Sequence, residues 1–315
     1  MRAPAPVREF ASKDFLSVLD LSHAELDHLI DLALTLKRQR GSRLAGSQPL
    51  AGKHVALLFE KPSLRTRITF VIAVRELGGE VIEPPPDVIF GGRETVEDVA
   101  RNLERWVDGA VVRTYEQSKL NSFAAAASRM HVVNALTNEE HPCQALADML
   151  TLRERLGSLA GRRLTYVGDG NNVAASLAQA GAMVGLHMVF SSPPGFELPP
   201  VVIDACTAVA RHGATITITN DPLQAVSGAD AIYTDVWASM GEEDQAAARA
   251  QVFEPFQVNA ELMRAASHGA LFMHCLPAHR GIEVTDAVMD SPASCVFDQA
   301  ENRLHSQKAL LALLM

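Results

Sequence analysis

The chain has 315 residues, of which 48% are hydrophobic and 21% are charged. This length is typical of two domains that each bury a core, and the composition excludes an intrinsically disordered protein. The formal net charge of −9 argues against a surface for nucleic acid or for an anionic membrane, so we expect neither as a partner.

The cysteines and the apolar segments bear on where the protein resides. The four cysteines, Cys143, Cys206, Cys275 and Cys295, lie far apart and form no Cys-x-x-Cys pair, which is typical of thiols in a reducing compartment. No apolar run reaches the ~18 residues that a membrane span requires, and residues 1–7 lack the apolar core of a signal peptide. We therefore expect a cytoplasmic protein.

Helical and strand periodicities alternate along the first half of the chain. Residues 22–38 carry apolar side chains at helical spacing, with Ser22 as the expected N-cap, and a buried strand is predicted for residues 55–59. The other predicted elements are strands at 80–82, 109–113 and 131–134 and helices at 65–77, 95–105 and 120–128. This repeated order of strand and helix predicts a parallel sheet covered on both faces.

The second half repeats the pattern. Its predicted elements are strands at 163–167, 187–191, 214–219, 231–234, 270–273 and 295–297 and helices at 174–184 and 200–212. A long helical stretch at 141–156 contains the predicted boundary, so that residues 1–148 form one domain and residues 149–301 the other. The predicted fold class is α/β, with two domains that are each a mainly parallel sheet flanked by helices, joined by interdomain helices. The last element, 302–315, is an apolar helix.

The segment Ser63-Leu64-Arg65-Thr66-Arg67 directly follows the predicted strand 55–59. The first backbone N–H groups of a helix have no partner inside the helix, and the helix dipole is positive there, so a helix start attracts anions. Arginine forks fit phosphate oxygens in pairs. We therefore predict a Ser/Thr-capped helix start that binds a phosphate or an acyl phosphate. The alternative is an ordinary N-cap with two surface arginines.

The segment Val167-Gly168-Asp169-Gly170-Asn171-Asn172-Val173 raises the alternative of a dinucleotide site, because it lies between a predicted strand and a predicted helix. However, Val173 occupies the position of the third glycine, and no acidic residue closes a strand ~20 residues further on. The chain also lacks the Gly-x-x-x-x-Gly-Lys-Ser/Thr loop and any cluster with the spacing of metal ligands. We expect no cofactor and no metal ion.

Three further segments accompany the anion motif: His141-Pro142-Cys143-Gln144, Asp235-Val236-Trp237-Ala238-Ser239-Met240-Gly241 and His274-Cys275-Leu276-Pro277. In this order the four segments resemble the transcarbamylase family, in its ornithine branch, and the resemblance runs from residue 15 to residue 303. It implies transfer of the carbamoyl group of carbamoyl phosphate to the δ-amine of L-ornithine, giving L-citrulline and phosphate for arginine biosynthesis. The alternative acceptors are N-acylornithine, putrescine and aspartate. A non-catalytic binding protein is disfavoured, because no catalytic motif is broken.

The resemblance also implies roles for individual residues. The residues expected to contact carbamoyl phosphate are Ser63, Leu64, Arg65, Thr66, Arg113, His141, Gln144, Cys275, Leu276 and Arg303. Those expected to contact L-ornithine are Asn172, Asp235, Ser239 and Met240. The implied catalytic residues are Cys275, Arg113 and His141, with Cys275 meeting the reacting nitrogen as a proton acceptor or as an orienting group. The helix 302–315 is expected to pack back on the first domain.

Two local features refine this expectation. Acidic residues 242–244 follow the Ser-Met-Gly segment, which favours a cationic amino acid over aspartate as the acceptor. In the family a glutamine before a Gly-Arg-x-Glu-like segment reaches the carbamoyl phosphate of a neighbouring subunit, but Ile89 stands at that position here. The resemblance implies a homotrimer or a multiple of trimers, and Ile89 leaves the shared contact open.

Overall fold

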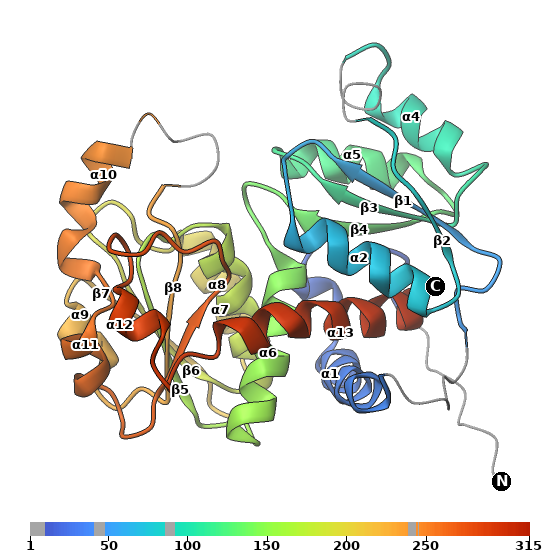
Figure 1. Cartoon of the computed structure of the whole chain (residues 1–315). Helices are drawn as coiled ribbons and strands as arrows, with labels where there is room; N and C mark the ends of the chain where they lie inside the picture. Colours follow the sequence, from blue (N-terminus) through green and yellow to red (C-terminus); the bar gives the residue numbers. More distant parts are fainter. Residues whose placement is uncertain (1–9, 41–47, 86–91, 239–243, 245) are drawn as a thin grey trace, which may run out of the picture. The chain divides into compact units, whose positions relative to one another are not determined.

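The computed structural model describes residues 10–40, 48–85, 92–238, 244 and 246–315. The chain forms two compact units, which we call unit 1 (Met1–Leu146 with Arg303–Met315) and unit 2 (Ala147–Asn302). The division falls inside two long helices, α6 (Pro142–Leu156) and α13 (Val296–Leu314), which therefore contribute residues to both units (Figure 1). Among the described residues, no helix is both long and apolar enough to cross a bilayer.

Unit 1 contains a four-stranded parallel sheet in the order β2-β1-β3-β4. Its strands are β1 (His54–Phe59), β2 (Glu80–Ile82), β3 (Gly109–Arg113) and β4 (His131–Leu136). Its helices, besides its parts of α6 and α13, are η1 (Val18–Asp20), α1 (His23–Gln39), α2 (Arg65–Glu76), α4 (Val96–Leu103) and α5 (Gln117–Ala126). The central strand β3 is buried along its whole length, as expected for a parallel strand covered on both faces.

Alternation along the strands divides the core of unit 1 into two layers. Alternate residues of β1 and β3, such as Leu58 and Val112, pack with Leu120 and Phe123 of α5 and with residues of α4. The other face of the sheet is covered by α2 and α13, as Figure 1 shows. Because Arg113 follows Val112 directly, its side chain emerges on this second face, the side on which α2 lies.

Unit 2 contains a five-stranded parallel sheet in the order β7-β6-β5-β8-β9. Its strands are β5 (Arg163–Val167), β6 (His187–Ser191), β7 (Thr215–Thr219), β8 (Ala231–Thr234) and β9 (Leu271–His274). Its remaining helices are α7 (Asn172–Val184), α8 (Pro200–Val209), α9 (Pro222–Val226), α10 (Ala246–Phe253), η3 (Glu254–Phe256), α11 (Ala260–Ala265) and α12 (Asp286–Met289). A core cluster joins β5, β8 and β9 to α9, α11 and α12. Helix α7 is buried from Val173 to Val184, as a helix that is apolar all round must be.

The predicted α/β fold class with two parallel-sheet domains is confirmed by both sheets. Ser22 caps α1 as predicted, because its hydroxyl accepts the N–H of Glu25 at 3.3 Å. The predicted strand at 295–297 is wrong: Cys295 donates its N–H to the carbonyl of Phe272, but the chain then turns into α13 at Val296. A three-residue apolar run cannot distinguish a strand from the first turn of a buried helix.

Candidate active site

The predicted phosphate residues of unit 1 gather at the carboxyl edge of its sheet. β1 ends at Phe59 and leads into α2, while the neighbouring strand β3 ends at Arg113, which is paired in register with Phe59. The chain leaves β4 at Leu136 and reaches His141 directly before α6. Since the strands are parallel, their carboxyl ends meet at one edge, which is where open α/β sheets place their ligands.

The start of α2 differs from the expected Ser/Thr-capped form. The N-cap residue is Leu64, and its side chain makes no capping hydrogen bond. The Leu64 side chain is 69% exposed, whereas Thr66 is buried. The prediction of a hydroxyl cap is therefore wrong. A helix start without such a cap keeps its N–H groups and its positive dipole end available to an anion.

Arg303 of α13 connects the start of α2 to the start of α6. Its Nη2 donates to Thr66 Oγ1 and its Nη1 donates to Gln144 Oε1, both at 2.6 Å. All three side chains are at least 98% buried. These two hydrogen bonds fix the Arg303 guanidinium. They also bring together three predicted residues that are far apart in the sequence.

His141 lies within the electrostatic reach of the arginines. Burial lowers the pKa of its imidazole well below the usual value, and the positive charges of Arg303, Arg113 and Arg65 lower this pKa further. The ring is therefore neutral near pH 7 and can donate one hydrogen bond without repelling the arginines. The arrangement concentrates positive charge around a neutral imidazole in a chain whose net charge is −9.

Arg67, the second arginine of the motif, is directed elsewhere. Its Nε lies 3.4 Å from a carboxylate oxygen of Glu83, and its guanidinium lies 5.5 Å from the ring centroid of Phe59. The side chain is 46% exposed. Of the two arginines in the motif, Arg65 is the one that acts on His141.

Unit 2 gathers its predicted residues at the carboxyl edge of its own sheet. Asp235 follows β8 and Cys275 follows β9, and these two strands are neighbours. The Cys275 thiol donates to Asp235 Oδ1 at 2.9 Å, and Asn171 Nδ2 donates to Asp235 Oδ2 at 2.9 Å. The Asp235 side chain is therefore held between the Cys275 thiol and the turn that follows β5. Asp235 is 95% buried.

The turn after β5 contains Asn171, which contacts Asp235, and is followed by the predicted residue Asn172. Asn171 caps α7, because its Oδ1 accepts the N–H groups of Val173 and Ala174, while Asn172 begins the helix. Gly170 allows the turn to approach its neighbour closely: a Cβ atom there would lie 2.5 Å from the backbone carbon of Glu197. The contact of Asn171 with Asp235 was missed, although an asparagine before an apolar helix is a recognisable N-cap signal.

A buried network supports the turn that contains Cys275. His274 Nδ1 accepts the N–H of Leu276 at 2.9 Å, so its Nε2 carries the hydrogen that faces Glu283 Oε1 at 3.1 Å. Gln299 accepts the N–H of His274 at 3.0 Å. Leu276 has φ of 59°, a conformation uncommon for leucine, and the hydrogen bond to His274 helps to hold it. Glu283 and Gln299 carried no sequence signal, because they lie in unrelated segments.

The ends of the neighbouring strands β8 and β9 bring together a potential set of metal ligands. The donor atoms of Asp235, His274 and Cys275 lie within 4.8 Å of one another, and all three residues are buried. Sequence spacing missed this group because two parallel strands supply it. Each donor already takes part in a hydrogen bond within the protein, namely Cys275 with Asp235 and Leu276 with His274. A metal ion would have to displace these bonds.

The family models match both halves of the chain. The carbamoyl-P binding domain of aspartate/ornithine carbamoyltransferase matches residues 13–154, and the Asp/Orn binding domain matches residues 160–314. The chain belongs to the aspartate/ornithine carbamoyltransferase family. The predicted resemblance is confirmed, and with it the class of enzyme, a carbamoyl-group transferase.

Similar members of the family are named as ornithine carbamoyltransferases. The protein from Parafrankia sp. is 50% identical over 306 residues, covering 96% of each chain, and that from Anoxybacillus flavithermus is 47% identical over 311 residues, covering 98% of each. The solved structure from Pyrococcus furiosus has a TM-score of 0.92 at 44% identity and covers 98% of each chain. That from Gloeobacter violaceus has a TM-score of 0.86 at 46% identity, covering 96% of this chain and 99% of the other.

Some predicted residues of the family site lie outside the part of the chain that the structure describes. These are Ser239 and Met240, which were predicted to contact the acceptor, and Ile89, which stands at the position of the family glutamine.

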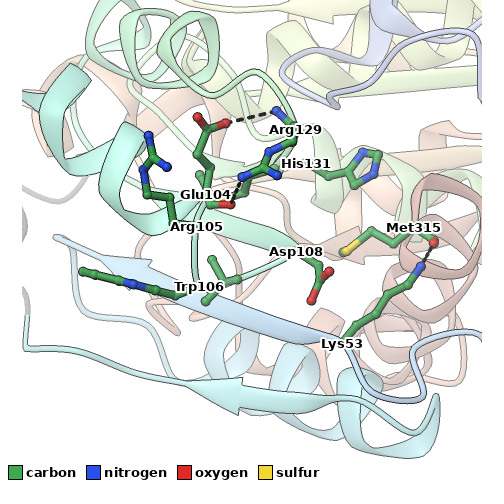
Figure 2. A pocket seen from close by; sticks show the side chains of 10 residues that line it. Lys53, Glu104, Arg105, Trp106, Asp108, Arg129, His131 and Met315 are labelled. Atoms are coloured by element: carbon green, nitrogen blue, oxygen red, sulfur yellow. Dashed lines mark hydrogen bonds between the residues drawn. The ribbon is translucent and has the colours of Figure 1, made fainter.

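A pocket of about 370 Å³ lies at the opposite edge of the unit 1 sheet, where β1, β3 and β4 begin (Figure 2). Three of its charged side chains make hydrogen bonds within the protein. Lys53 donates to the terminal main-chain oxygen of Met315, and Glu104 accepts the backbone N–H of Arg129 at 3.1 Å. Asp108 accepts the N–H of His54 at 2.8 Å. Because none of the predicted phosphate residues lines it, this pocket is not the predicted phosphate site.

Proposed function

We propose that the chain transfers the carbamoyl group of carbamoyl phosphate to the δ-amine of L-ornithine, giving L-citrulline and phosphate. The proposal depends most on one observation: the buried Arg303 donates to both Thr66 and Gln144 at 2.6 Å, which joins the start of α2 to the start of α6 beside the buried His141. Membership of the carbamoyltransferase family and similarity to proteins named ornithine carbamoyltransferases support the reaction and the acceptor.

In this proposal unit 1 binds carbamoyl phosphate. The N–H groups at the start of α2, with Ser63, Leu64, Arg65 and Thr66, hold the phosphate. Arg113 and Arg303 stabilise the charge that develops on the leaving phosphate, and His141 with Gln144 orients the carbamoyl group. The neutral imidazole suits this role, because it donates a hydrogen bond to a carbonyl oxygen and adds no further positive charge.

Unit 2 binds the amino acid. Asp235 pairs with the α-ammonium group, the turn at Asn171 and Asn172 supplies amide groups, and Ser239 and Met240 complete the contact. Cys275 meets the δ-nitrogen, and the main chain of Cys275 and Leu276 faces the carbamoyl group. The hydrogen bond between Cys275 and Asp235 supports this arrangement, since a thiol that already donates to a carboxylate can turn its sulfur lone pairs to an amine N–H.

The chemical step requires an amine without its proton, although a free amine of this kind has a pKa of about 10.4. The nitrogen lone pair attacks the carbonyl carbon and forms the C–N bond, and the C–O bond to phosphate breaks with its electron pair leaving on phosphate. The nitrogen loses a proton as the amide forms. Preorganised donors at the carbonyl oxygen and positive charge at the leaving oxygens lower the barrier.

The proposed division of labour follows the domains: residues 1–148 with the helix 302–315 bind carbamoyl phosphate, and residues 149–301 bind L-ornithine. An acidic run at 242–244 favours a cationic acceptor over aspartate. Purified protein is expected to form citrulline only when both substrates are present. Faster turnover with N-acetylornithine, putrescine or aspartate would overturn the choice of acceptor, whereas absence of any carbamoylated product would overturn the reaction.

We further propose a cytoplasmic homotrimer, or a multiple of trimers, that serves arginine biosynthesis. The family resemblance supports this assembly, and Ile89 at the position of the family glutamine leaves the contact between subunits open. Sedimentation of the active enzyme is expected to give three chains or a multiple of three. An active monomer would contradict the assembly and leave the reaction unaffected.

A further inference from the structure

Arg249 of α10 makes an unusual set of contacts in unit 2. Its Nη1 donates to Asp169 Oδ2 at 2.7 Å and to the main-chain oxygen of Trp237 at 2.8 Å. The guanidinium carbon lies 5.0 Å from the ring centroid of Phe196. The side chains of Arg249 and Asp169 are only 12% and 13% exposed, so the ion pair is mostly shielded from solvent.

These contacts join two turns that matter for the acceptor. Asp169 lies in the turn after β5, two residues before Asn171, and Trp237 lies two residues after Asp235. Asn171 and Asp235 are themselves joined by a hydrogen bond of 2.9 Å. Arg249 therefore forms a second link between the same two turns, which we call the outer link. The hydrogen bond between Asn171 and Asp235, the proposed substrate residues, is the inner link.

An aromatic cluster supports the outer link. Phe253 of α10 packs against Trp237 with ring centroids 5.7 Å apart and meets Phe196 edge-on at 4.9 Å. The helix that carries Arg249 is thus held against both the Trp237 segment and the segment of Phe196. An exposed ion pair contributes little to stability, but this charge-assisted pair is largely buried and is held in place by packed rings on α10.

We propose that Arg249 is a positioning residue for the amino-acid substrate. It fixes the distance between the turn of Asn171 and Asp235, and these two groups bind the α-amino end of ornithine. This inference depends on the proposed function. Arg249 itself does not touch the substrate. Its loss is expected to let the two turns separate, so that the acceptor binds weakly while carbamoyl phosphate, held by unit 1, binds normally.

The test compares Arg249→Gln and Asp169→Asn with the wild-type enzyme. Each variant is expected to raise KM for ornithine about tenfold or more, while the Kd of carbamoyl phosphate stays within about twofold; tenfold corresponds to about 1.4 kcal/mol. Binding of L-norvaline, which keeps the α-amino and carboxylate groups and lacks the δ-amine, is expected to weaken equally. The double variant is expected to lose no more than the single ones, because the two residues act as one pair.

The matched control is the ion pair at the other edge of the same sheet. Arg162 Nη1 lies 3.0 Å from Asp230, and these residues precede the same strands, β5 and β8. Arg162→Gln is expected to leave both KM values unchanged. Arg249→Lys is expected to recover part of the affinity, since an ammonium keeps the charge but lacks the planar fork.

The outcomes separate the inference from the proposed function. A wild-type enzyme that makes no citrulline would overturn the proposed function. An active wild type with unchanged KM for ornithine and unchanged norvaline affinity in Arg249→Gln would overturn the inference alone. Equal losses of affinity for carbamoyl phosphate and ornithine, with a lowered Tm, would assign Arg249 a merely structural role and would also overturn it.

Discussion

At the scale of single residues, charge decides what each half of the site can hold. Arg65, Arg113 and Arg303 place positive charge around His141, whose imidazole stays neutral because burial and these charges both oppose its protonation. In unit 2 the carboxylate of Asp235 accepts hydrogen bonds from the thiol of Cys275 and the amide of Asn171. The first arrangement suits a phosphate, and the second suits an ammonium group.

Arg65→Lys tests whether the guanidinium fork matters as well as the charge. A lysine keeps the charge but cannot form paired hydrogen bonds to phosphate oxygens. We therefore expect a lower kcat/KM for carbamoyl phosphate, which corresponds to a loss of at least about 2 kcal/mol of transition-state stabilisation. Steady-state kinetics measure this. Arg75→Lys, at the exposed far end of the same helix, is the control and is expected to behave as wild type. Near-normal kinetics for Arg65→Lys would place the phosphate elsewhere.

His141 is expected to make stability depend on pH. Its pKa in the folded protein lies well below the ordinary value of 6.5, so the unfolded chain takes up the proton first as pH falls. Stability is therefore lost as pH drops below about 6.5 and is unaffected by this residue above that value, with a slope of at most about 1.4 kcal/mol per pH unit.

Denaturant unfolding of wild type and His141→Gln between pH 7.5 and 5.5 measures the effect. The difference in unfolding free energy between the two proteins is expected to shrink as pH falls, because only wild type carries the buried imidazole. A constant difference across this range would contradict the neutral, buried state of His141.

At the scale of elements, the turns at the carboxyl edges of the sheets contain most of the residues proposed for the site. The turn between β5 and α7 depends on Gly170, whose Cβ, if present, would lie 2.6 Å from the carbonyl oxygen of Glu197. The backbone of Glu197 cannot move aside as a flexible side chain would. The position of Asn171, and through its hydrogen bond that of Asp235, therefore depends on the absence of a side chain at residue 170.

Gly170→Ala is expected to raise KM for ornithine several-fold while leaving carbamoyl phosphate binding unchanged, because the displaced turn belongs to unit 2 alone. Gly161→Ala is a useful counterpart: Gly161 has φ of 80° and no atom within 4 Å of its would-be Cβ. That substitution is expected to lower Tm through backbone strain and to leave both KM values alone. If Gly170→Ala bound ornithine normally, the turn would not be a substrate contact.

How far the sequence predicted these elements depended on the length and regularity of each pattern. The strands of both sheets followed from apolar runs between turn signals, since parallel strands are buried on both faces. The short run at 295–297 was misread as a strand, because three apolar residues carry no period. The hydroxyl cap on α2 was also wrong, because hydroxyl groups near a helix start do not reveal where the helix begins.

The contacts that hold the site together were largely beyond prediction from the sequence. The bonds of Arg303 to Thr66 and Gln144 join residues more than 150 positions apart. The positions of Glu283 and Gln299 behind His274 likewise result from the packing of segments with no common motif. Local periodicity contains no information about such pairs, whereas the family resemblance supplied the residue types without their partners.

At the scale of the whole molecule, most residues proposed for carbamoyl phosphate belong to unit 1, and those proposed for ornithine belong to unit 2, as do Cys275 and Leu276, which are proposed to face the carbamoyl group. The arginines of unit 1 supply positive charge that suits the anionic carbamoyl phosphate, whereas ornithine is assigned to unit 2. Because carbamoyl phosphate neutralises the arginines and also supplies the carbonyl that the amine attacks, we expect it to bind before the amino acid.

Product-inhibition kinetics and direct binding test this order. Phosphate is expected to compete with carbamoyl phosphate, and ornithine is expected to bind measurably only once the first substrate is present. Calorimetric titration of ornithine into the enzyme alone provides the comparison. Tight binding in that titration would refute the order and leave the reaction unaffected.

Activity is expected to rise with pH above neutrality, since the acceptor amine must lose its proton before it reacts. The pH profile of kcat/KM for ornithine measures this, with L-norvaline binding as the control for the α-amino end. A profile that is flat between pH 7 and 9 would show that deprotonation of the amine does not limit the reaction.

The central claim concerns one covalent bond, and isotope labelling observes it directly. The enzyme is incubated with ¹³C-carbamoyl phosphate and L-ornithine labelled with ¹⁵N at the δ-position, and the product is examined by ¹³C NMR. We predict a one-bond ¹³C–¹⁵N coupling on the carbamoyl carbon, with phosphate released in equal amount. A labelled carbamoyl carbon without this coupling, or one found only in hydrolysis products, would contradict the assignment.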